Sequence, residues 1–194
     1  MWVSNDYTEQ PAAGTNYLKL VNGSNLLRMV GSIENDTSIT GIVGWTENAE
    51  GERCPHRWRK GEKAPDLQFV DPPKQFVATL VFGYLAGTVQ LWDIPQKTIR
   101  EDLLAFYRND DWGDLRGFDV DVIKKGEKLE TRYKVLPKPK AKLDAVAKAE
   151  VMDKMDKINV LALFDGEDPF AGMGTPKATG GGDPFGGMDE EVPY

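Results

Sequence analysis

The sequence predicts a mainly β fold: a small Greek-key barrel of five strands, with one or two helices and a disordered acidic C-terminal tail. Three observations lead to this class. Segments of alternating apolar and polar residues recur between turn residues, one stretch of helical period interrupts them, and residues 165–194 are rich in Gly, Pro and Asp. The 194 residues are 40% hydrophobic, which is enough for one buried core.

The N-terminal part predicts an arm followed by three strands. Residues 1–16 are polar and lack a period, so we expect a flexible arm before a domain over 17–164. Asn22-Gly23 is a two-residue turn signal between residues 17–21 and 26–30, which predicts a first hairpin. Residues 39–46 form a further strand, in which Gly41 and Gly44 indicate a bend or a close approach of another segment.

A long basic loop is expected between residues 47 and 74, because Gly and Pro interrupt every pattern there. Five basic residues and Glu62 give residues 53–63 a charge of +4, in a chain whose net charge is −7. Trp58 lies in the middle of this segment. A cationic loop that carries a ring suits a polyanion with flat faces, such as single-stranded nucleic acid; the alternative is a solvated loop whose Trp packs back onto the domain.

The second half of the domain predicts two more hairpins around a helix. Residues 75–84 and 88–92 form the central hairpin, and Pro95 opens a helix with an apolar stripe that ends near residues 109–113. Residues 118–122 and 129–135 alternate in polarity and form a third hairpin, whose second strand turns Arg132 and Lys134 outward. Pro137 and Pro139 are expected to end the β region, and residues 141–164 to form one helix or two short ones.

The tail, residues 165–194, cannot bury enough apolar surface to order itself. Within it, the motif DPFAGM at residues 168–173 recurs as DPFGGM at residues 183–188. The repeat is either a duplication within a low-complexity tail or a recognition motif that is presented twice.

A series of hairpins, with one helix between the central hairpin and the hairpin at residues 118–135, suggests a barrel of the oligonucleotide-binding (OB) type. Such barrels carry rings that stack on bases and cations that follow phosphates. The predicted DNA-binding residues are the ring-bearing and basic side chains of this region: Arg28, Trp45, Arg53, Arg57, Trp58, Arg59, Lys60, Lys63, Lys74, Phe76, Tyr84, Arg132 and Lys134.

The succession of motifs resembles a known family. GWTE at residues 44–47, the segment RCPHRW, QFVATLVFGYLAGTVQLWDIPQKTI at 75–99, DWGD at 111–114 and FDVDVIKKGEKLETRYKVLP resemble the bacteriophage single-stranded-DNA-binding proteins with an OB barrel. The likeness covers residues 17–164. It implies a non-catalytic protein that coats single-stranded DNA, with little regard to sequence, during phage replication, recombination and repair in the host bacterial cytoplasm.

The last residues resemble the acidic C-terminal tip of bacterial single-stranded-DNA-binding proteins, in which acidic residues precede an apolar residue, a proline and a terminal aromatic residue. In that family the tip docks replication and repair enzymes. The resemblance implies the same role for Asp189, Glu190, Glu191, Val192, Pro193 and Tyr194, although Tyr194 stands where that family has Phe. The alternative is an acidic tail that serves solubility alone.

Other functions are less well supported by the residues. Cys54 and His56 are the single Cys and the single His, which are too few for a structural zinc site, and we expect no metal, cofactor or small-molecule substrate. No segment has the apolar length of a membrane span. Asp110, Asp111 and Asp114 could suggest a metal-dependent nuclease, but they also fit a capped turn. A second hypothesis is an OB-fold adaptor that binds a replication or transcription protein and contacts nucleic acid incidentally.

Overall fold

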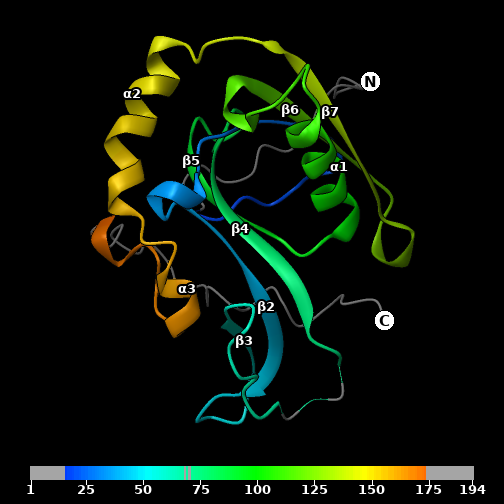
Figure 1. Ribbon diagram of the computed structural model, residues 1–194, viewed down its shortest axis with the longest axis vertical. Helices are drawn as coiled ribbons and strands as arrows, with labels where there is room; N and C mark the ends of the chain where they lie inside the picture. Colours follow the sequence, from blue (N-terminus) through cyan, green and yellow to red (C-terminus); the bar gives the residue numbers. More distant parts are fainter. Residues whose placement is uncertain (1–15, 68, 70, 174–194) are drawn as a thin grey trace, which may run out of the picture.

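The computed structural model describes residues 16–67, 69 and 71–173, and its class is mainly β as predicted. Seven strands, rather than five, form one antiparallel sheet in the order β3-β2-β4-β1-β6-β7, with β5 paired to β4 (Figure 1). Within the described part, the strand pairings run as an open path. The strands are β1 Gly23–Met29, β2 Ser38–Glu47, β3 Arg53–Trp58, β4 Lys74–Gly83, β5 Thr88–Ile94, β6 Phe118–Lys125 and β7 Arg132–Lys140; the α-helices are α1 Lys97–Arg108, α2 Ala145–Lys154 and α3 Ala162–Asp165.

β4 is the central strand of the sheet. It pairs with β5, and it also pairs with β2 over its first half and with β1 near its end. Because β1 lies between β4 and β6, the hairpin predicted for residues 17–21 with 26–30 does not form. Residues 16–18 run beside β5 instead. The amide of Leu18 donates to the carbonyl of Leu91, and the amide of Leu91 donates to the carbonyl of Asn16.

Two other expectations about strands are corrected. Residues 53–58 of the predicted basic loop form β3, because they pair with β2 from Glu47 back to Ile42. β7 continues through Pro137 and Pro139 to Lys140. A proline is tolerated there because β7 is the last strand of the described sheet, so a missing amide costs no ladder bond on its outer edge.

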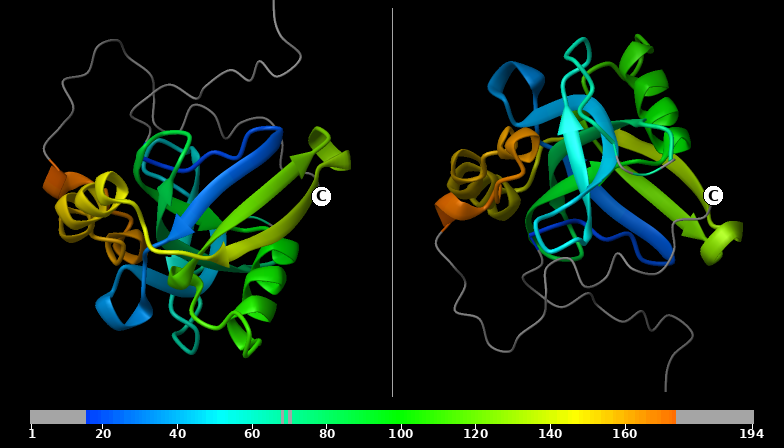
Figure 2. Two further views of the ribbon diagram at one scale, coloured as in Figure 1. Left: turned by 90° about the horizontal axis from the view of Figure 1, so that it is seen from above. Right: turned by 90° about the horizontal axis from the view of Figure 1, so that it is seen from below.

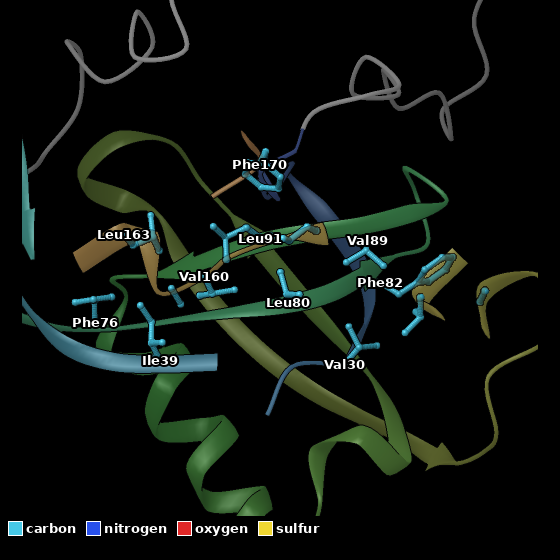
Figure 3. Packing of buried hydrophobic residues seen from close by; sticks show 14 residues of the cluster. Val30, Ile39, Phe76, Leu80, Phe82, Val89, Leu91, Val160, Leu163 and Phe170 are labelled. Carbon is cyan, nitrogen blue, oxygen red and sulfur yellow. The ribbon is translucent and has the colours of Figure 1, made fainter. Parts of the chain in front are cut away.

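The sheet buries an apolar cluster on each face. α1 covers one face, the α1 face, with Trp92 and Phe118 among its buried residues. α2 and the chain that follows it to Met173 cover the other face, the α2 face, over Leu80 and Leu91 (Figure 3). Figures 1 and 2 show α1 on one side of the sheet, and α2 and α3 on the other.

The packed chain extends beyond residue 164, where the tail was predicted to begin. Phe170 is buried in the α2-face cluster with 6% of its surface exposed. The predicted arm up to residue 15 and the predicted tail from residue 174 lie outside the described residues. Among the described residues, no helix has both the length and the apolar character needed to cross a bilayer.

Candidate nucleic-acid interface

The register of β2, β3 and β4 brings several predicted residues onto the α2 face. Residues directly opposite each other in paired strands point to the same face, as does every second residue along a strand. Glu47 pairs with Arg53, Val43 with Arg57, and Val43 also with Lys74. The residues that share this face are therefore Trp45, Arg53, Arg57, Lys74 and Phe76.

The same face continues across the other half of the sheet. Arg28 pairs with Phe82 of β4 and with Asp119 of β6. On the hairpin β6–β7, Ile123 pairs with Lys134, and Lys125 pairs with Arg132. Ile123 and Lys125 share the face of Asp119, so Lys134 and Arg132 point to the α2 face as well. The predicted strand residues thus share one face, with a single exception.

That exception is Trp58, which corrects the prediction of an exposed stacking ring. Trp58 pairs with Ile42, so it points to the face opposite Arg57, and 6% of its surface is exposed. Its neighbour Arg57 lies on the α2 face because alternate residues of a strand point in opposite directions. The alternative correctly placed this Trp against the domain, but residues 53–58 form β3 and are not a solvated loop.

At the β2–β3 edge, the exposed cation of Arg53 lies over the half-buried ring of Trp45. The Arg53 guanidinium lies 4.4 Å from the ring centroid of Trp45 and 4.9 Å from that of Phe69. Its Nη2 donates to a carboxylate oxygen of Asp71 at 2.6 Å, and the Arg53 side chain remains 40% exposed. The carboxylate and the two rings orient this cation, while Trp45 stays half-buried. Phe69 was not predicted as part of this site.

The other basic residues of this edge fall into two groups. Arg57 binds Asp93 at 2.7 Å and Arg59 lies 3.5 Å from Glu62, so both already have an anionic partner. Lys60, Lys63 and Lys74 are exposed and form no ion pair with a described residue. These three lysines are the cations most readily available to a phosphate.

Phe76 is buried, with 2% of its surface exposed, which corrects its prediction as a stacking residue. Its ring lies 6.2 Å from that of Phe164, and the guanidinium of Arg57 lies 5.5 Å from its centroid. The segment around Phe164 therefore covers the part of β4 that we expected to be accessible to DNA.

Arg28 and Tyr84 meet at Asp119, where both side chains bond the same carboxylate oxygen. Arg28 is 2% exposed and also donates to the carbonyls of Arg116 and Ala141, so it is a structural residue rather than an exposed cation. Burial and the bond to Asp119 raise the pKa of Tyr84 to about 12. Tyr84 is therefore a neutral donor at physiological pH.

A cationic cleft of about 660 Å³ opens where β7 leads into α2, and the sequence analysis missed it. None of the described residues that line it is acidic. Lys138, Lys140 and Lys142 recur at every second position, which is a usable signal, but Pro137 and Pro139 beside them predict the end of the β region. The lining residues are Arg28, Arg116, Gly117, Lys140, Ala141, Lys142, Leu143 and Lys148.

The centre of the α2 face is closed by the chain itself. Ala147, Val151 and Phe170 are buried in one cluster with Leu80 and Leu91 (Figure 3). β3 and β7 are the outermost strands of the sheet order. The accessible cations of the α2 face and its edges therefore lie in two areas, one at the β2–β3 edge and one at β7 and the cleft.

The aspartates considered for a metal site do not gather. The Asp114 carboxylate accepts hydrogen bonds from the backbone and side chain of Arg116, and these bonds lower its pKa. The amide of Asp111 donates to the side chain of Asn109, as in a capped turn. In the part of the chain that the structure describes, no three His, Cys, Asp or Glu side chains lie close enough to hold a metal ion.

Comparisons with protein-family models, with curated proteins and with solved structures found no match. The tip residues Asp189 to Tyr194 lie outside the described residues.

Proposed function

We propose that this protein binds single-stranded DNA, with little sequence preference, along the rims of the α2 face. One observation carries the proposal: strand register aligns Trp45, Arg53 and Lys74 on the same face as Arg132 and Lys134. A strand of nucleic acid needs rings and cations that can be reached together, and this face supplies both. The buried residues Arg28, Trp58 and Phe76 are not part of the proposed contact surface.

We also propose that the sheet is a variant of the OB barrel. β1 and β2 pair with successive parts of β4, so they can be regarded as two halves of one bent strand. The succession is then bent strand, β4, β5, α1, β6 and β7, with the bent strand joined to both β4 and β6. This agrees with a partly open five-stranded Greek-key barrel, in which α1 contacts both β5 and β7.

In this assignment, the β2–β3 area and the Arg132 end of β7 correspond to loops that bind oligonucleotides in OB folds, whereas the cleft lies at the opposite end of β7. β3 and the lysines after it belong to the long connection between the first two strands, β2 and β4. Arg132 follows the connection between the last two, β6 and β7. The face of the second and third strands, which also binds in OB folds, is occupied here by α2 and the chain to Met173.

In the proposed complex, a base stacks on the face of the Trp45 ring that points away from the Arg53 guanidinium, and phosphates pair with Lys60, Lys63 and Lys74. The cleft beside Lys140 and Lys142 receives phosphates at the other rim. We propose that the protein serves phage DNA replication, recombination and repair in the bacterial cytoplasm, and that its acidic tip recruits partner enzymes.

The second candidate is an adaptor that binds a replication or transcription protein. It is favoured by the carboxylate partners that Arg53, Arg57 and Arg59 already have, because such pairs leave less free positive charge for DNA.

A gel-shift experiment separates the two candidates. Oligothymidine should be retarded at lower protein concentration than a duplex of the same length, and its affinity should fall with salt as counterions are released. Equal retardation of both DNAs, or binding that salt leaves unchanged, would refute the proposed function.

A further inference from the structure

The first copy of the repeated motif, residues 168–173, packs against the domain. Phe170 is buried, and its ring meets that of Tyr17 edge-on at 5.2 Å. The carbonyl of Pro169 accepts a hydrogen bond from the amide of Asn159 at 2.8 Å. The Asp168 carboxylate accepts from the amide of Phe170, and the amide of Met173 donates back to the carbonyl of Phe170.

Gly172 is also required at this site, because a Cβ atom there would lie 2.9 Å from the carbonyl oxygen of Lys157. Ala171, by contrast, is exposed. In addition, Pro169 is buried and Met173 packs against the α2-face cluster, so only the exposed fourth position of the motif has no contact that a change would disturb.

The second copy, residues 183–188, retains every residue on which this docking depends. Its single difference is Gly186 in the position of the exposed Ala171. The two copies therefore differ only at a position that faces solvent, as expected if both can occupy the same site.

We propose that residues 183–188 bind the same site in exchange with residues 168–173 of the same chain. The exchange changes the reach of the acidic tip. With the first copy docked, residues 174–188 separate the anchored motif from Asp189; with the second copy docked, Asp189 follows the anchored Met188 directly. The site then sets whether the tip extends on a tether or is held against the domain.

Loop closure explains why the first copy occupies the site. Residues 166–167 join α3 to the first motif, whereas residues 166–182 would join α3 to the second. The probability of closing a flexible loop falls as about the 3/2 power of its length, so the second copy is disfavoured by roughly 25-fold. Phe170→Ala should reverse this preference.

Melting temperatures of four full-length proteins test the exchange: the natural chain, Phe170→Ala, Phe185→Ala and the double variant. Phe185→Ala alone should leave the melting temperature unchanged. Phe170→Ala should lower the melting temperature by only about 4 to 8 °C, since the second copy replaces the first at that roughly 25-fold cost. The double variant should fall several degrees further. Equal melting temperatures for Phe170→Ala and the double variant would refute the exchange.

A spin label on the tip measures how close the tip lies to the docking site, which melting temperatures do not report. A nitroxide on Asp189→Cys, in a Cys54→Ser background, should broaden the amide signals of Tyr17 and Asn159 strongly in Phe170→Ala and weakly when Phe185→Ala is added. Ala171→Gly, which makes the two motifs identical, is the matched control and should leave the broadening of the natural chain unchanged. Equal broadening in the single and double Phe variants would overturn the proposal. Neither measurement uses DNA, so the result is independent of the proposed function.

Discussion

At the scale of single residues, the two tryptophans of the β2–β3 pair have opposite environments. Trp45 is half-buried beside Arg53, whereas Trp58 points to the other face and is buried. Trp45→Ala should weaken oligothymidine binding by about 5- to 150-fold, because one stacked base contributes about 1–3 kcal/mol. Its melting temperature should change little. Fluorescence anisotropy titrations at fixed salt would measure the affinity.

Trp58→Ala is the control for this experiment. It removes a buried ring and should lower the free energy of unfolding by about 3–5 kcal/mol. If Trp45→Ala binds oligothymidine as tightly as the natural protein does, Trp45 is not a stacking residue.

Tyr84 gives a second residue-scale prediction, in alkaline solution. Its pKa is about 12 in the folded protein and about 10 in an unfolded chain, so the folded state retains the phenolic proton longer. The contribution of Tyr84 to stability is therefore complete below pH ~10 and is lost as the pH rises toward 12. Tyr84→Phe should lose less stability between pH 9 and 11 than the natural protein does, as measured by urea midpoints. Equal losses of stability in Tyr84→Phe and in the natural protein would contradict the raised pKa of Tyr84.

At the scale of elements, the path from β7 into α2 supplies Lys140 and Lys142 to a cleft whose lining, among the described residues, contains no acidic side chain. Replacing Lys140 and Lys142 together by Gln should weaken DNA binding. Each phosphate contact to single-stranded DNA contributes about 0.7 to the slope of log affinity against log salt, so the slope should fall by about 1.4. Both lysines are exposed, so the fold should persist.

The matched control lies on α1, on the other side of the sheet (Figure 1). Lys97→Gln with Arg108→Gln removes the same charge from exposed positions. An equal fall of the salt slope in both double variants would mean that net charge, rather than the cleft, governs binding.

At the scale of the whole molecule, the acidic tip and the cationic rims have opposite charge. Deleting Asp189 to Tyr194 should preserve or tighten oligothymidine binding, because the tip then no longer competes for the cations. The same deletion should abolish recovery of replication enzymes in pull-down experiments. Partner recovery that survives the deletion would remove the docking role of the tip.

The sequence determined those features that depend on local pattern. The mainly β class, β2, β4, β5 and α1 follow from periodicity and turn residues, and the outward position of Arg132 and Lys134 follows from alternation. Pairing partners lie far apart in the chain, so periodicity could not indicate that β1 pairs with β4 and β6 in place of residues 17–21.

Tertiary structure alone decided which rings are buried and which cations meet. A strand pattern does not say which face another element will cover, so the burial of Trp58 and Phe76 and the cover formed by α2 and Phe170 became evident in the fold. The same holds for the cleft, whose cations come from β1, β7, α2, the connection between β7 and α2, and the segment before β6. The sequence specified the residue types available to the proposed DNA-binding surface, whereas the long-range pairing of strands decided which of them share an accessible face.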